Sequence, residues 1–293
     1  MSIPEGHIPL KPDPNRLYKS MMTHPSSPPA VHTAHLTLTV LGRRLAAQRL
    51  EPPGPQDPEQ PVLVFLHEGL GSIMVWGDFP AQLVTACGLP GLLFDRLGHG
   101  RSDALPSSDV DPEYIEREAW AFLPQVLSRC GIRKSILIGH SDGGTIALMY
   151  AARYPEGVAG VITEAAHVRV EDVTRQGIRD IVSAYRRGDL KPRLQKYHDV
   201  DVDPLFYRWS DTWLSDRFAP WNVEGLLPGV RCPVLVIQGE ADEFATPAQV
   251  DAIVSGVSGP AERFMVPGAR HIPHHQAREA VAERMLRFIR RLV

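Results

Sequence analysis

The sequence has few cysteines, no long apolar run and no excess of positive charge. Its three cysteines, Cys87, Cys130 and Cys232, are odd in number and widely spaced, which argues against a disulfide framework or a metal cluster and indicates reduced, buried thiols. No stretch approaches the roughly eighteen apolar residues of a membrane span. The 31 basic and 34 acidic residues include no basic block, so nucleic acid is not an expected partner. We therefore expect a cytoplasmic protein.

The length and the local composition of the chain predict its domain organisation. A chain of 293 residues suits one large domain or a domain with an insertion. Residues 1–34 are rich in proline and carry neither a basic nor an apolar leader pattern, so we predict a tail and no secretion signal. The sequence gives no indication of the oligomeric state.

Short apolar runs alternate with helix-compatible segments from residue 35 onwards. A hairpin around Gly42 comes first, and continuous apolar runs follow, as buried parallel strands do when helices cover both faces of a sheet. The runs cover residues 62–66, 91–95, 135–139, 158–163, 232–239 and 263–268. This alternation of apolar runs and helix-compatible segments stops between residues 168 and 228, where the sequence is polar and has a helical pattern. We predict an α/β core at 35–167 and 229–293, interrupted by a helical insertion at 168–228.

The pattern Gly139-His140-Ser141-Asp142-Gly143 stands where a predicted buried strand ends and a helix begins. Glycines on both sides of a serine allow a strained turn that presents the hydroxyl at the carboxyl edge of the sheet. Two interpretations follow: Ser141 is a nucleophile, or it is an ordinary cap of the following helix. The context favours the nucleophile.

A serine nucleophile needs a base and an orienting carboxylate, and both should follow later strands. Glu240 and Asp242 come after one strand and compete for the acid role, in which we prefer Asp242 because it lies deeper in the loop. His271 comes after the next strand and is the predicted base. His140 is excluded because adjacent residues of a tight turn project in different directions. An acidic surface loop is the alternative interpretation of Asp242.

Two further histidines follow His271. His274 and His275 lie around the start of the last helical region, and with His271 they could suggest a metal site. No cysteine or clearly spaced carboxylate completes such a site, so we predict no bound metal.

Backbone N–H groups should stabilise the negative charge that develops on a reacting carbonyl oxygen. Asp142, directly after the nucleophile, is one predicted donor. The glycine-rich loop His67-Glu68-Gly69-Leu70-Gly71 supplies the other, with Gly69 as the candidate and Leu70 next. A plain turn is the alternative for this loop.

The insertion and the loop after the first run supply candidate substrate contacts. Phe206, Trp209 and Trp213 fall at helical spacing, and they either pack the insertion onto the core or line an apolar pocket. Glu68 and Leu70 are predicted to line the same pocket. The Asp142 carboxylate either lies in the first turn of its helix or faces the pocket, where together with Glu68 it would favour an ammonium-bearing substrate.

Five motifs in order carry a resemblance to a known family. They are HEGLG, DRLGHGRS, GHSDGG, GEADEFATP and GARHIPH, each placed after a predicted strand. With them the chain resembles the α/β-hydrolase superfamily in its esterase, proline-iminopeptidase and C–C hydrolase branch, and its GHSDGG turn is similar to that of the biphenyl-hydrolase-like group. The resemblance covers nearly all of residues 35–293. It implies a mostly parallel eight-stranded sheet with helices on both faces and a helical cap at 168–228.

The same resemblance implies roles and an activity. Ser141 would be the nucleophile, His271 the general base and then acid, and Asp242 the orienting acid, with no cofactor. The expected function is a carboxylesterase-like serine hydrolase that cleaves a small ester, thioester, lactone or amide through an acyl-enzyme. One alternative is a C–C bond hydrolase that acts on a dienone acid from aromatic degradation. Another is a binding protein on a hydrolase fold.

Overall fold

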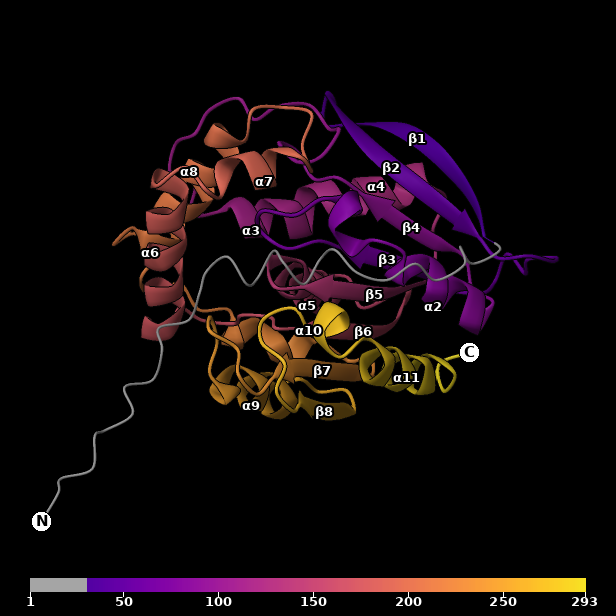
Figure 1. The fold of residues 1–293 in the computed structure, drawn as a ribbon. Coiled ribbons are helices and arrows are strands. Elements are labelled where there is room, and N and C mark those ends of the chain that lie inside the picture. Colours follow the sequence, from indigo (N-terminus) through magenta and orange to yellow (C-terminus); the bar gives the residue numbers. More distant parts are fainter. Residues whose placement is uncertain (1–30) are drawn as a thin grey trace, which may run out of the picture.

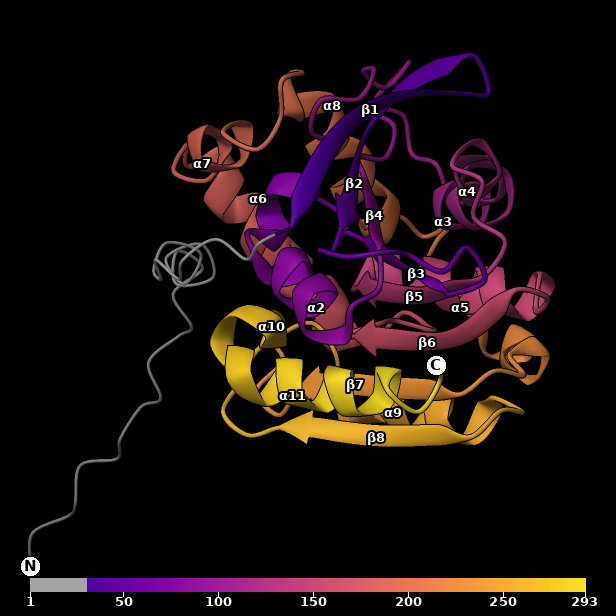
Figure 2. The ribbon, with the colours of Figure 1, turned by 90° about the vertical axis from the view of Figure 1, so that its right-hand side faces the viewer.

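The chain forms one continuous sheet with helices on both faces (Figures 1 and 2). The computed structural model describes residues 31–293, so nearly all of the predicted tail lies outside the described residues. Eight strands follow the spatial order β1-β2-β4-β3-β5-β6-β7-β8. Their bounds are His32–Val40 (β1), Arg43–Glu51 (β2), Val62–Leu66 (β3), Gly91–Phe94 (β4), Ser135–His140 (β5), Val158–Glu164 (β6), Val234–Gly239 (β7) and Ala261–Val266 (β8).

The first two strands form the predicted hairpin at one edge of the sheet. Leu41 and Gly42 both have positive φ at its turn, and β2 then pairs antiparallel with β4. The pairs from β4 through β3, β5, β6 and β7 to β8 are all parallel. The predicted mostly parallel, eight-stranded α/β sheet is therefore confirmed. Strand β1 begins at His32 and not at residue 35, so the last residues of the predicted tail belong to the sheet.

Alternating side chains of the central strands build two apolar cores. Val64 and Leu137 point to one face and contribute to a core with α4, α5 and α9, whereas Phe65 and Ile138 point to the other and pack with α2 and α11. This division follows from the two-residue period of a strand. The helices of the core are α2 (Phe79–Cys87), α3 (Tyr114–Arg117), α4 (Leu123–Arg129), α5 (Asp142–Arg153), α9 (Pro247–Gly256), α10 (Pro273–Gln276) and α11 (Arg278–Ile289).

The insertion leaves the sheet after β6 and returns at the adjacent strand β7. It contains α6 (Asp172–Arg186), α7 (Lys191–Gln195) and α8 (Val202–Leu214). Helices α6 and α8 pack against each other at one end of the sheet (Figure 1), where the ring of Tyr185 stacks on that of Phe206 at a centroid distance of 3.6 Å. The segment is helical, as its sequence predicts.

The three cysteines are free thiols, but they are half-buried and not fully buried as the sequence suggests. Burial raises the pKa of Cys232 to about 11, so this thiol stays protonated at neutral pH. Across residues 31–293, no helix combines the length and the apolar content needed to cross a membrane.

Candidate active site

The turn at Ser141 joins β5 to α5 in a strained conformation. Ser141 has a φ of 52° and a ψ of −118°, which residues other than glycine rarely adopt. A Cβ at Gly139 would lie 2.2 Å from the carbonyl oxygen of Gly143, and one at Gly143 would lie 2.0 Å from that of Leu66. The motif therefore needs both glycines. The Ser141 side chain makes no capping hydrogen bond to α5, so the helix-cap interpretation finds no support.

Two loops bring an imidazole and a carboxylate to the serine hydroxyl. In the loop after β8, His271 places its Nε2 3.0 Å from Ser141 Oγ and its Nδ1 2.8 Å from Asp242 Oδ1. An ionised carboxylate only accepts hydrogen bonds, so Nδ1 donates to Asp242 and Nε2 can accept from the serine. The competing acid, Glu240, is exposed to solvent. The structure thus brings Asp242, and not Glu240, to the imidazole.

The imidazole and the carboxylate shift each other's pKa. Burial alone would lower the pKa of His271, but the charge and hydrogen bond of Asp242 raise it above the ordinary value. Burial alone would raise the pKa of Asp242, but the charge and hydrogen bond of His271 keep it below the ordinary value. The arrangement stabilises a protonated imidazole beside the serine, which a group that accepts the serine proton requires.

The remaining histidines of the predicted set have other partners. His140 contacts the backbone carbonyl oxygen of His271 through Nε2 at 2.7 Å. His274 is paired with the buried carboxylate of Glu164, with 3.1 Å between Nδ1 and Oε2, and His275 contacts the carbonyl oxygen of Val75. Among the described residues, no three His, Cys, Asp or Glu side chains are grouped as a metal site would require.

Of the two predicted oxyanion donors, Asp142 follows Ser141 in the chain, and Gly69 lines the same pocket as Ser141. The N–H groups of Gly69 and Asp142 have no hydrogen-bond acceptor within residues 31–293. A Cβ at Gly69 would lie 2.5 Å from Nε1 of Trp209 and 3.0 Å from Oδ2 of Asp142, so only glycine fits at this position. Backbone N–H groups of the kind that stabilise an oxyanion are therefore without an acceptor from the described part of the chain at these two positions.

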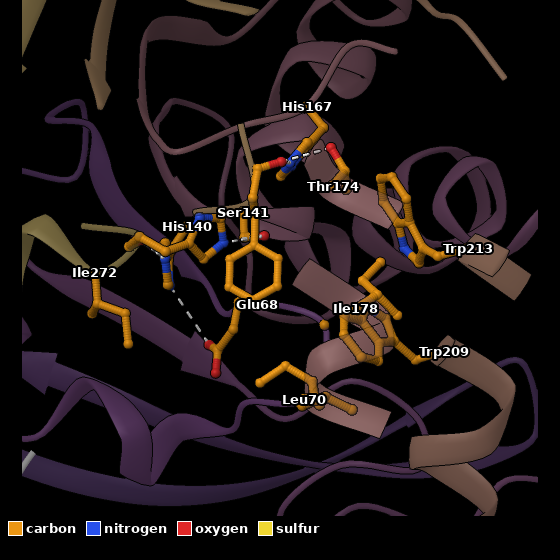
Figure 3. A pocket seen from close by; sticks show the side chains of 14 residues that line it. Glu68, Leu70, His140, Ser141, His167, Thr174, Ile178, Trp209, Trp213 and Ile272 are labelled. Carbon is orange, nitrogen blue, oxygen red and sulfur yellow. Dashed lines mark hydrogen bonds and ion pairs between the residues drawn. The ribbon is translucent and has the colours of Figure 1, made fainter. Parts of the chain in front are cut away.

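A pocket that is open at one side lies over Ser141 (Figure 3). Helices α6 and α8 supply much of its apolar wall, and Figure 3 shows Trp209, Trp213 and Ile178 across from the Glu68 carboxylate, which faces His140. The lining residues are Glu68, Gly69, Leu70, His140, Ser141, His167, Thr174, Ile178, Ile181, Trp209, Trp213, Phe244, His271 and Ile272. Such a site suits a small, mainly apolar ligand.

Two predicted pocket contacts are placed elsewhere. Phe206 is fully buried against Tyr185 and does not line the pocket, which corrects its assignment as a substrate contact. The Asp142 carboxylate does not line it either. This side chain is 2% exposed and accepts a hydrogen bond of 2.8 Å from the hydroxyl of Tyr114. Of its two predicted locations, the structure shows the first turn of α5.

Sequence reasoning missed several residues of the pocket wall. Thr174, Ile178 and Ile181 lie on one face of α6, and their spacing along the helix was the available signal. His167 and Phe244 come from loops after β6 and β7. No local pattern in the sequence distinguishes these two from ordinary loop residues.

Comparisons with known proteins indicate the family to which the chain belongs. The family described as "alpha/beta hydrolase fold" matches residues 61–213. The chain is 30% identical over 190 residues to the Homo sapiens protein named "Serine hydrolase BPHL", and the match covers 62% of each chain. It is 27% identical over 259 residues to a 2-succinyl-6-hydroxy-2,4-cyclohexadiene-1-carboxylate synthase of Enterobacter sp. (strain 638), covering 80% of this chain and 93% of the relative.

Solved structures show the same fold. An enol-lactonase from Burkholderia xenovorans superposes with a TM-score of 0.67 at 20% identity, over 87% of this chain and 99% of that one. A proline iminopeptidase from Mycobacterium smegmatis gives a TM-score of 0.66 at 20% identity, over 88% and 98% of the two chains. With a family match over more than half of its length and this architecture, the chain belongs to the α/β-hydrolase fold family.

Proposed function

We propose that this chain is a serine hydrolase that cleaves a small ester, thioester, lactone or amide through an acyl-enzyme. The observation that supports the proposal is the pair of hydrogen bonds from Ser141 to His271, at 3.0 Å, and from His271 to Asp242, at 2.8 Å. A serine hydroxyl is a weak nucleophile until an oriented imidazole removes its proton. Here that arrangement lines an apolar pocket.

In the proposed reaction, Ser141 Oγ bonds to the substrate carbonyl carbon while its proton passes to His271 Nε2. The carbonyl oxygen becomes negative and accepts hydrogen bonds from the N–H groups of Gly69 and Asp142. The imidazolium then donates its proton to the leaving group, whose bond to the carbonyl carbon breaks. Water repeats the sequence on the acyl-enzyme, and Asp242 stays ionised throughout.

The charge of the pocket favours some substrates over others. Burial would raise the pKa of Glu68, but the neighbouring His140 lowers it to about 2, so Glu68 is ionised at neutral pH. Glu68 Oε2 lies 3.8 Å from His140 Nδ1, and the carboxylate also lines the pocket. A fixed negative charge repels a substrate carboxylate and tolerates or attracts a neutral or cationic group. This supports ester or amide hydrolysis over C–C cleavage of a dienone acid.

We further propose that residues 168–228 act as a cap domain that determines the acyl specificity. Ile178 and Ile181 of α6 and Trp209 and Trp213 of α8 form the pocket wall opposite the sheet. Rings and branched side chains at this place exclude water from the reacting carbonyl.

Labelling with an organophosphonate tests the nucleophile. The wild type should be labelled at Ser141, and Ser141→Ala or His271→Ala should abolish labelling and lower kcat/KM by at least about 10³-fold. The matched control is Ser255→Ala, which removes an exposed serine hydroxyl of α9 and should change neither quantity. Labelling that survives in Ser141→Ala would contradict the assignment.

A substrate panel separates the alternatives. It contains aryl esters, aminoacyl esters, lactones and dienone acids, each assayed with wild type, Ser141→Ala and Glu68→Gln. We expect turnover of neutral or amino-bearing esters, and an improved relative rate on acidic substrates in Glu68→Gln. A wild-type preference for the dienone acid would favour the C–C hydrolase. The absence of both labelling and turnover would favour a binding protein.

A further inference from the structure

The motif Asp95–Ser102 contains a buried charge that the reaction above does not use. Arg96 follows β4 and is one of the largest fully buried side chains, with 2% exposure. Burying a guanidinium is costly unless hydrogen bonds and an opposite charge compensate for the lost water. The groups that contact the buried Arg96 guanidinium therefore indicate its role.

On one side, Arg96 holds the peptide that carries the N–H of Gly69. Its Nη2 donates to the carbonyl oxygen of Glu68 at 2.7 Å, and its backbone N–H donates to Nε2 of His67 at 3.1 Å. Nδ1 of His67 donates in turn to the same Glu68 carbonyl at 2.8 Å. Burial and the charge of Arg96 lower the pKa of His67 to about 3, so its imidazole is neutral, with one donor and one acceptor nitrogen.

Because a peptide bond is planar, the contact of Arg96 with the Glu68 carbonyl oxygen also restrains the N–H of Gly69, the proposed oxyanion donor. The carbonyl of Glu68 and the N–H of Gly69 belong to one planar trans unit and point in opposite directions. Fixing the carbonyl oxygen with the Arg96 and His67 donors therefore fixes the direction of the Gly69 N–H, which faces away from Arg96.

On the other side, Arg96 approaches the second donor residue. Its Nη1 lies 3.8 Å from Oδ2 of Asp142, and the hydroxyl of Tyr114 donates to the same oxygen at 2.8 Å. Tyr114 accepts in turn a hydrogen bond of 2.8 Å from Nε1 of Trp213, a pocket residue. These contacts hold the carboxylate outside the pocket lining, and a negative charge that faced the pocket would oppose the oxyanion.

We propose that Arg96 and Tyr114 are positioning residues of the oxyanion hole, which together fix the Gly69 peptide and the Asp142 side chain in one geometry. The inference rests on the proposed serine hydrolase function and adds residues that touch neither the substrate nor the serine. It predicts that their loss weakens binding of the transition state and leaves binding of the ground state nearly unchanged.

The test compares Arg96→Lys, which keeps the charge and loses the planar fork, with Arg101→Lys, an exposed arginine of the same loop. Removing one oxyanion donor outright costs about 10²–10³-fold in kcat, and we expect displacement of the donors by Arg96→Lys to lower kcat by about 10–10²-fold. KM should change by less than about 3-fold. The Ki of a trifluoromethyl ketone, whose adduct carries the oxyanion, should rise by the same factor by which kcat/KM falls. Arg101→Lys should match the wild type.

Tyr114→Phe is the second variant, because it keeps the ring and removes the hydroxyl with its two hydrogen bonds, to Asp142 and from Trp213. We expect a smaller loss of kcat and a parallel loss of ketone affinity. The kcat of each variant is calculated per site that the phosphonate labels. If Arg96 and Tyr114 had only a structural role, their variants would be less stable but would keep the wild-type kcat per labelled site. That result would overturn the inference. If Arg96→Lys does not fold, an unchanged kcat and ketone affinity in Tyr114→Phe overturns it. A wild type that the phosphonate does not label would instead refute the proposed function.

Discussion

His271 acquires its basicity mainly from one neighbour. Burial disfavours its protonated form, and the Asp242 carboxylate at 2.8 Å overcomes this effect, so the pKa of His271 lies above the ordinary value. The proposed base must be neutral to accept the serine proton. The rate of the proposed reaction should therefore depend on pH mainly through the contact between His271 and Asp242.

Replacing Asp242 with asparagine should separate orientation from charge. kcat/KM falls as the pH is lowered through the pKa of His271, because protonation removes the base. Asp242→Asn removes the charge that raises this pKa, so the acid limb of the profile should move to lower pH, while kcat falls by about 10³–10⁴-fold. A pH profile of kcat/KM for both proteins measures the shift. The control is Glu240→Gln, which changes an exposed carboxylate of the same loop. If the acid limb of the Asp242→Asn profile stays at the wild-type pH, the proposed role of Asp242 is contradicted.

Side chains of helix α8 both pack against helix α6 and line the pocket. Phe206 lies in its first half and stacks on Tyr185 of α6, whereas Trp209 and Trp213 lie further along and reach the pocket. Seven residues of helix span about 10 Å, so a single apolar face can extend beyond a ligand site.

This division predicts different effects for two substitutions in α8. Phe206→Ala should lower the free energy of unfolding by about 3–5 kcal/mol because it leaves a cavity between α6 and α8, and it should change KM equally for an acetyl ester and a bulky acyl ester. Trp209→Ala should raise KM for the bulky ester more than for the acetyl ester. Denaturant unfolding and steady-state kinetics measure both effects. Equal changes in KM for the two esters in Trp209→Ala would show that this ring has only a structural role.

At the scale of the whole molecule, the insertion and the sheet share one apolar core. Val64 and Leu137 of the central strands belong to the same buried cluster as Ile178, Leu205 and Phe218 of the insertion. Segments that bury their apolar surface against each other lose stability together.

The insertion should therefore unfold together with the sheet. In the double variant Trp76→Phe/Trp120→Phe the remaining tryptophans, Trp209, Trp213 and Trp221, all lie in residues 168–228, so their fluorescence reports on the insertion. We expect the fluorescence and far-ultraviolet circular dichroism transitions in urea to coincide, as cooperative unfolding requires. A fluorescence midpoint at lower urea would show that the insertion unfolds on its own.

Much of the fold and several site positions could be predicted from the sequence. Buried parallel strands have short, continuous apolar sequences because helices cover both faces of the sheet, and this pattern located the core strands. Reactive side chains of such sheets follow strand ends, so Ser141, Asp242 and His271 could be chosen before any contact was known. The glycines of the serine turn follow from close backbone approach, which the composition of the motif already encodes.

The tertiary structure alone decided how side chains from distant segments meet. It placed Asp242 against His271 and left Glu240 in solvent, although both lie in one loop. It turned Phe206 away from the pocket and brought Arg96 to both the Glu68 carbonyl oxygen and the Asp142 carboxylate. Periodicity reports which face of an element is buried, because that depends on the residue's own neighbours along the chain. A partner within hydrogen-bond distance depends instead on the packing of segments far apart in sequence, and no local pattern records it.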